Sequence, residues 1–206
     1  LHQGQICMAT GRVLVQRSLY PRFLEKLVAK AKSLKVGNPA TGDVAIGPLI
    51  NAQQRDHAAK IVADAQAAGA TLATGGSYQD LFFEPTVLSD VGRDNPAFHE
   101  EIFAPVAVVV PFDTDDEAVE LANDSEYGLS MAIVSSNVGR ALKLGERLRT
   151  GLLHINDQTV NDEVINPFGG VGASGNGTSI GGPSNIDEFT QWQWLTVKGE
   201  APAYPI

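Results

Sequence analysis

Short runs of apolar residues recur along this sequence, and between them apolar residues return at every third or fourth position. The runs predict β-strands, because a few consecutive apolar residues suit a strand that is buried on both faces. VAVVVPF is the clearest candidate for such a buried strand. The predicted strands are RVLVQ (12–16), TLATGG (71–76), FFEPTVL (82–88), VAVVVPF (106–112), MAIVSS (131–136) and LLHIN (152–156).

The stretches between the strands have the spacing of amphipathic helices. The first helix follows residues 12–16, with Ser18 as its expected N-cap and Pro21 in its first turn, where proline is tolerated. A second helix follows the loop GNPATGDVAIGPLI and should stop at Gly69. The face that this second helix is expected to bury consists of Ala58, Ile61, Val62, Ala65 and Ala68.

Two further helices are predicted in the second half of the chain. Thr114 and Glu117 have the spacing of a capping box and start a helix that should end near Gly128. Residues 140–149 form the other. A succession of strands and helices favours an α/β fold with a largely parallel sheet and flanking helices.

The regular pattern is lost after residue 156. Residues 157–183 form a long irregular stretch dense in glycine, and loops of this length in compact domains are usually functional or disordered. The sequence FTQWQWLTV (189–197) then alternates in polarity, which predicts one more strand before a tail that contains proline.

Composition and charge narrow the classes of function. The 206 residues suit one substantial domain or a domain with an appendage, and the formal net charge of −9 argues against binding to nucleic acid or to an anionic membrane. The apolar runs are too short to span a bilayer, and the first residues of the sequence do not predict a signal peptide. A single cysteine and an acidic balance favour a reducing compartment, so we expect a cytoplasmic protein.

The single cysteine, Cys7, has two interpretations. A lone cysteine is commonly an inert core residue. Here Gly4 precedes it and the small residues 9–11 follow it, which permits a turn with a partly exposed thiol. A Cys/His hydrolase is disfavoured, because no residue obviously orients His2 as a base. No cluster of residues has the spacing of metal ligands.

Four motifs resemble the aldehyde dehydrogenase superfamily and occur in the family's order. LHQGQICMATGR resembles its cysteine signature, with His2 where many members carry asparagine. EEIFAPV (100–106) is similar to its Glu-Ile-Phe-Gly-Pro segment, with Ala104 in place of the glycine. GNPATGDVAIGPLI and NPFGGVGASGNG resemble two further segments. The C-terminal sequence is similar to that of the benzaldehyde dehydrogenase branch, which oxidises aromatic aldehydes.

The resemblance implies roles for four residues. Cys7 would be the nucleophile, with its own backbone N–H as one donor to the oxyanion. Glu101 would bind the nicotinamide ribose hydroxyls, and Phe103 would pack near that ribose, with NAD as the expected cofactor and NADP as the alternative. Phe168 would line the substrate tunnel. The competing interpretations are a solvated surface for Glu101 and core positions for Phe103 and Phe168.

Other positions are affected less directly by the resemblance. Asn156 matches an amide near the active-site cysteine that would brace a loop. Gln54 and His57 match positions at which some members touch the cofactor ribose, although both fit an exposed helix face. Many relatives have an Arg-Glu pair that is proposed to help relay protons. Thr178 and Ser179 stand at these positions here, so the resemblance implies no such relay in this chain.

The resemblance also implies a domain organisation. Residues 1–188 would form the catalytic domain that carries the cysteine, and residues 189–206 a C-terminal oligomerisation strand and tail. The NAD-binding domain, the general base and the second oxyanion donor are expected upstream, so the chain is expected to begin partway through its parent protein. GVGASG (170–175) is expected to be a loop, because no strand and helix flank it as in a phosphate-binding motif.

Three functions remain open from the sequence. The first is an NAD(P)-dependent aldehyde dehydrogenase that acts on a small aromatic aldehyde as a homo-oligomer, dimer or tetramer. The second is a truncated, non-catalytic association module. The third is a CoA-acylating relative, in which CoA rather than water resolves the thioester. An upstream sequence with a glutamate base would separate them.

Overall fold

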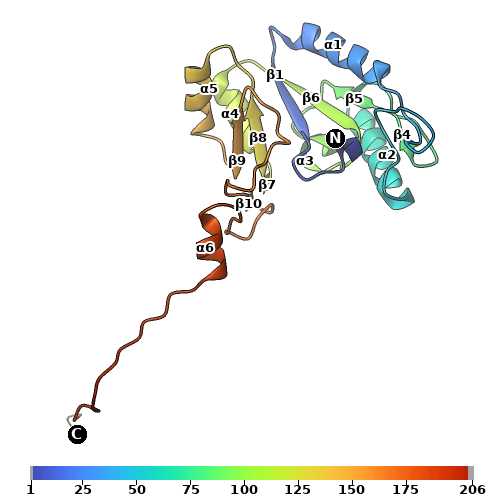
Figure 1. Ribbon diagram of the computed structural model, residues 1–206. Helices are drawn as coiled ribbons and strands as arrows, with labels where there is room; N and C mark the ends of the chain where they lie inside the picture. Colours follow the sequence, from blue (N-terminus) through green and yellow to red (C-terminus); the bar gives the residue numbers. More distant parts are fainter. Residues whose placement is uncertain (1, 204–206) are drawn as a thin grey trace.

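The computed structural model describes residues 2–203 and is built around a four-stranded sheet (Figure 1). The strand order is β1 (Arg12–Gln16), β6 (Val106–Phe112), β5 (Thr86–Ser89) and β2 (Thr71–Thr74). The first three strands run parallel, with Arg12 opposite Val108 and Thr86 opposite Val106, whereas β2 is antiparallel to β5. The α/β class with a largely parallel sheet is therefore confirmed.

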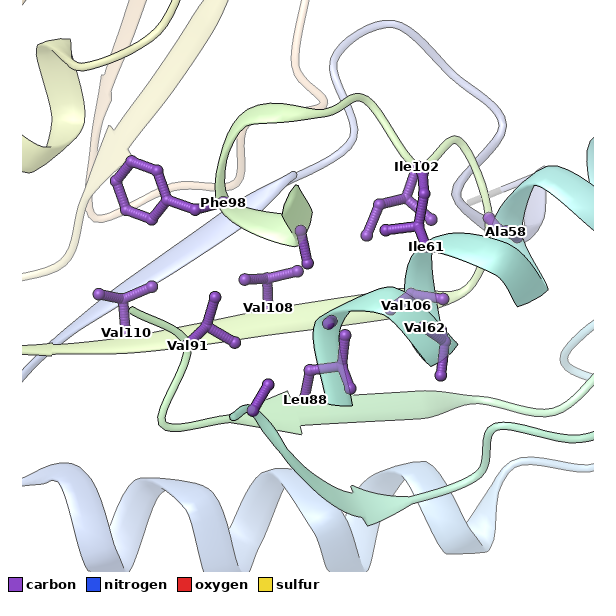
Figure 2. Packing of buried hydrophobic residues seen from close by; sticks show 14 of the residues in the cluster. Ala58, Ile61, Val62, Leu88, Val91, Phe98, Ile102, Val106, Val108 and Val110 are labelled. Carbon is purple, nitrogen blue, oxygen red and sulfur yellow. The ribbon is translucent and has the colours of Figure 1, made fainter. Parts of the chain in front are cut away.

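Helices cover both faces of this sheet. On one face lie α2 (Ala52–Ala67) and the short α3 (Pro96–His99), and on the other lies α1 (Tyr20–Ser33). Successive residues of β6 serve opposite faces, as the pleat of a strand requires. Val108 and Val110 pack with α2 and α3, as Figure 2 shows, while Val109 packs under α1.

A second group of elements lies beside β1 (Figure 1). It contains α4 (Asp115–Asn123), β8 (Ser130–Ile133), α5 (Val138–Gly145) and β9 (Leu152–Ile155), in which β8 and β9 pair in parallel as a separate two-stranded sheet. The parallel strands are thus divided between two sheets. The remaining short elements are η1 (His2–Gly4), β3 (Tyr78–Gln79), β4 (Phe82–Phe83), β7 (Tyr127–Gly128), β10 (Val171–Gly172) and α6 (Ser184–Phe189).

Beyond α6 the chain leaves the body of the molecule as an extended tail (Figure 1). The side chains of Trp192 and Trp194 are exposed, at 102% and 92% of their reference areas. Among residues 2–203 the segment 190–203 pairs with no strand, so the C-terminal strand stays a prediction. Residues 204–206 of the expected tail lie outside the described residues. No helix between residues 2 and 203 is long and apolar enough to cross a bilayer.

Five of the six strands predicted before residue 157 are present, but the single strand predicted at 82–88 is two strands, β4 and β5, which lie in different sheets on either side of Glu84 and Pro85. Several helix ends also differ from the prediction. Ser18 is not the cap of α1, because the chain turns tightly out of β1 and the N-cap residue is Leu19, without a side-chain hydrogen bond. Ala68 is exposed rather than buried, since it follows the last residue of α2. The third predicted helix ends at Asn123 instead of near Gly128, and the fourth covers Val138–Gly145.

Candidate active site

Cys7 lies in a tight turn that leads into β1. The carbonyl of Ile6 accepts a hydrogen bond from the N–H of Ala9 at 2.8 Å, which closes the turn around Cys7. The thiol is exposed, whereas the next residue, Met8, is buried in the core at 6% exposure. Met8 therefore anchors the turn and leaves the thiol accessible.

The segment before Cys7 contacts the segment before β6 through Gly4. His2, Gln3 and Gly4 have φ angles of 47°, 58° and 75°, a left-handed turn that suits glycine best. A Cβ atom at Gly4 would lie 2.3 Å from the carbonyl oxygen of Ala104, so only glycine permits this approach. The two backbones consequently touch here.

Side chains hold the Cys7 loop on two other sides. The Oε1 atom of Gln5 accepts a hydrogen bond from the N–H of Ile50 at 2.9 Å, just before α2 begins. The hydroxyl of Thr10 is 2.9 Å from that of Thr159, which is buried in the loop after β9. The loop is thus fixed to both groups of elements.

Residues Glu101–Phe103 form the segment between α3 and β6. Glu101 is exposed, and Phe103 is half-buried with a φ of 51°, an unusual value for a bulky residue. From α2, the Nε2 atom of Gln54 donates to the carbonyl oxygens of Ile102 and Phe103, at 2.8 and 3.1 Å. His57 Nε2 lies 3.2 Å from the carbonyl oxygen of Glu101.

The parallel pairing of β1 with β6 brings these two segments together. Cys7 precedes β1 and Glu101 precedes β6, and the amino ends of adjacent parallel strands lie at the same edge of a sheet. Cys7, Glu101 and Phe103 therefore gather at the amino edge of the central sheet. Most open α/β sheets bind ligands at the opposite, carboxyl edge.

Phe168 lies in a different part of the chain, in the glycine-rich stretch after β9. Its backbone N–H donates to the carbonyl of Ile180 at 2.6 Å, and the N–H of Ile180 donates back at 2.9 Å. The ring is half-buried. The contacts described for residues 2–203 do not join Phe168 to the Cys7 loop.

The charge of Glu101 acts on Tyr127 of β7. Burial is the main cause that raises the pKa of Tyr127, and the negative charges of Glu126, Glu101 and Glu100 raise it further. Because β7 pairs with β10, the glycine-rich stretch approaches the same region. Residues 170–175 form the turn around β10 and precede no helix, in agreement with the predicted loop.

Asn156 braces a loop, which is the role that the sequence favoured. Its φ is 59°, and its Oδ1 atom accepts a hydrogen bond from the N–H of Ser135 at 2.8 Å. Asn156 thereby links the end of β9 to the residues after β8.

Gln54, His57, Gln5 and Thr159 support the site in ways that sequence reasoning missed. Gln54 and His57 are half-buried and bond to main-chain carbonyls, so neither simply occupies an exposed helix face. Side-chain contacts with a distant backbone leave no local pattern in a sequence. The family resemblance drew attention to Gln54 and His57 as possible contacts of the cofactor ribose, but it did not predict their hydrogen bonds to main-chain carbonyls.

Two surface hollows lie away from the Cys7 loop and Glu101, one of them beside α4 and β5. The other, of ≈ 650 Å³, lies between α4 and α5, where Arg140 pairs with Asp115 and Arg147 with Asp116. Within the described part of the chain, no group of three or more His, Cys, Asp or Glu side chains is arranged to hold a metal ion.

Comparison with known proteins finds relatives over nearly the whole of this chain. Vanillin dehydrogenase from an Amycolatopsis species is 51% identical over 205 residues, which cover 99% of this chain and 42% of that protein. Benzaldehyde dehydrogenase [NAD(+)] from Pseudomonas putida is 48% identical, over 100% of this chain and 42% of its own length. The chain thus spans well under half of each of these relatives.

A solved structure shows the same fold. The crystal structure of a salicylaldehyde dehydrogenase from Pseudomonas putida G7, complexed with salicylaldehyde, superposes with a TM-score of 0.92 at 36% identity. That match covers 99% of this chain and 42% of the other. The model of the aldehyde dehydrogenase family matches residues 1–195, which include Cys7, Glu101, Phe103 and Phe168. The resemblance of the four motifs is confirmed, and the chain belongs to the aldehyde dehydrogenase family.

Proposed function

We propose that this chain carries the nucleophile of an NAD-dependent enzyme that oxidises aromatic aldehydes to carboxylic acids. The observation that carries the proposal is the exposed thiol of Cys7, which is held at the same sheet edge as Glu101 and Phe103. The vanillin, benzaldehyde and salicylaldehyde dehydrogenases among its relatives favour an aromatic substrate.

Cys7 acts as the nucleophile in this proposal. Its thiolate adds to the aldehyde carbonyl, and the resulting oxyanion needs a hydrogen-bond donor. Within residues 2–203 the backbone N–H of Cys7 donates to no other group, so it is available for that oxyanion. After hydride loss the substrate is held as a thioester on the sulfur, which water then hydrolyses with the help of a general base.

Glu101 and Phe103 fit one end of the cofactor. An exposed carboxylate offers two acceptor oxygens, which suit the two hydroxyls of a ribose, and a half-buried ring beside it offers an apolar surface. A bound nicotinamide would supply the hydride acceptor. NAD is the expected cofactor, with NADP as the alternative. Phe168 is proposed to form an apolar wall for the substrate.

The remaining parts of the reaction are assigned to an upstream domain. The motifs of residues 1–206 offer no match to the family's general base or to its dinucleotide-binding glycines. Residues 1–188 are accordingly proposed as the catalytic domain and residues 189–206 as the oligomerisation strand and tail. The exposed indole rings of Trp192 and Trp194 support a homo-oligomer, and the acidic, cysteine-poor composition supports a cytoplasmic location.

The test is oxidation of benzaldehyde and of an aliphatic aldehyde with NAD+ by the natural gene product, alongside its intact mass. We expect faster turnover of benzaldehyde, a carboxylic acid product, and loss of turnover in Cys7→Ala. An acyl-CoA product that forms only with added CoA would favour the CoA-acylating alternative. A natural product of 206 residues without turnover would favour an association module.

A further inference from the structure

Gln54 occupies a central position between the two segments of the candidate site. Its Nε2 group donates to two carbonyl oxygens, those of Ile102 and Phe103, and these are the two residues that directly follow Glu101. The amide is half-buried, so water competes only partly for these carbonyls. A single side chain thus fixes the course of the backbone on the carboxyl side of Glu101.

The held backbone is one that would not stay in place unaided. Phe103 has a φ of 51°, in the left-handed region that a bulky residue rarely adopts. Such a conformation persists only where the surroundings impose it. Here the surroundings are Gln54 on one side and Gly4, packed against Ala104, on the other.

The same end of α2 also holds the nucleophile loop. Gln5 accepts the N–H of Ile50, and the next residue, Asn51, is the N-cap of α2 and accepts the N–H of Gln54 at 2.9 Å. One helical turn therefore connects Gln5, two residues before Cys7, with the backbone that follows Glu101.

We propose that the first turn of α2 is a strut that sets the position of Glu101 relative to Cys7, with Gln54 as a positioning residue. This inference rests on the proposed cofactor role of Glu101. Gln54 acts through the main chain of Ile102 and Phe103, to which its amide donates two hydrogen bonds.

The test compares Gln54→Met with Gln53→Met in the natural gene product. Methionine has nearly the same length as glutamine but no N–H donor, and Gln53 is exposed on the same helical turn. In Gln54→Met we expect faster amide hydrogen exchange in the peptide 100–106 and about tenfold weaker binding of NAD+ by calorimetry, for the loss of two hydrogen bonds. Gln53→Met should match the wild type in both.

The rate of Cys7 alkylation and the melting temperature separate positioning from a general loss of structure. We expect alkylation by iodoacetamide in Gln54→Met to stay within about twofold of the wild type, because the turn around Cys7 is closed by Ile6 and Ala9. Unchanged hydrogen exchange in peptide 100–106 would overturn the proposal that the first turn of α2 holds this segment. A fall in melting temperature without weaker NAD+ binding would overturn the positioning role.

A double-mutant cycle with Glu101→Gln decides whether Gln54 acts through Glu101. If it does, Gln54→Met should weaken NAD+ binding much less in the Glu101→Gln background than in the wild type. Fully additive losses would overturn the inference. If the wild type binds no NAD+, the proposed cofactor role of Glu101 fails, whereas hydrogen exchange still decides whether Gln54 holds the segment.

Discussion

Gly4 is the residue at which the nucleophile loop touches the backbone that leads into β6. We expect Gly4→Ala to lower the free energy of unfolding by about 1–3 kcal/mol, because the new Cβ would meet the Ala104 carbonyl at 2.3 Å and would sit at a φ of 75°. Urea unfolding measures this loss. The clash with the Ala104 carbonyl should also displace the Cys7 loop. We therefore expect NAD+ binding and aldehyde turnover to fall as well.

The matched control for this change is Gly11→Ala in the same loop. Gly11 has open space around the position of a Cβ and no left-handed φ. Its substitution should change the free energy of unfolding by less than about 0.5 kcal/mol. Equal losses in the two variants would show that the contact with Ala104 is not the cause.

The residues of the site were predictable to the extent that they belong to local motifs. Cys7, Glu101 and Phe103 each lie within a short stretch that resembles a family segment, and the parallel pairing of β1 and β6 explains why these stretches meet. The two hydrogen bonds of Gln54 were not predictable, because they join a helix to a backbone nearly fifty positions away. No periodicity along the chain records such a contact.

Between elements, Arg12 joins β1 to the end of α4. Its guanidinium donates to the carbonyls of Leu121, Ala122 and Asp124 at 2.9, 3.2 and 3.0 Å, and lies 4.5 Å from the centre of the Phe98 ring. Desolvation lowers the pKa of Arg12, and the charge of Asp124 opposes that shift. A cation at the carboxyl end of a helix also suits the helix dipole.

We expect Arg12→Met to lower the free energy of unfolding by about 2–3 kcal/mol, since it leaves partly buried carbonyls without a donor. Arg17→Met, at the other end of β1, is the control. Arg17 pairs with Asp113 on the surface, and exposed pairs contribute less than about 1 kcal/mol. Urea unfolding of both variants checks the comparison, and a larger loss in Arg17→Met would contradict it.

The ion pair between Asp115 and Arg140 connects the start of α4 with α5 and should make stability depend on pH. The hydrogen bonds from Arg140 are the main cause that holds the pKa of Asp115 below its usual range, against the opposing effect of burial. A carboxyl group with a lowered pKa stabilises the fold above its unfolded pKa of about 4, and this contribution is lost as the pH falls through the folded pKa.

Asp115→Asn should therefore lower the melting temperature at pH 7 and have a smaller effect as the pH falls below about 4. Melting curves of the wild type and the variant across this range provide the measurement. A difference in melting temperature that stays constant with pH would mean that the charge of Asp115 contributes nothing.

The existence of the helices and strands could be predicted from the sequence better than the residues at which they begin and end. Strands such as β6 are recognisable because every residue is apolar, and burial on two faces demands that composition. The end of α4 depends on Arg12, which belongs to β1 and binds the last carbonyls of the helix. The division of the parallel strands into two sheets likewise depends on packing that no single stretch records.

At the scale of the whole molecule, the tail after α6 exposes large apolar side chains that no other part of the described chain covers. Indole rings at 102% and 92% exposure favour burial against another chain. We expect the double variant Trp192→Ser with Trp194→Ser to sediment as a smaller species than the wild type. An unchanged sedimentation coefficient would mean that these rings take no part in assembly.

The pairing of β1 with β6 also has a consequence for the order of events during folding. Arg12 and Val108 become neighbours only when the long intervening chain closes into a loop, and such non-local pairings form slowly. We therefore expect the two segments of the candidate site to meet in a slow phase of folding, when the central sheet is completed. A refolding chain that has formed α2 and α5 but not the central sheet should not bind the cofactor. The rate at which cofactor binding returns during refolding therefore measures the rate at which the central sheet closes.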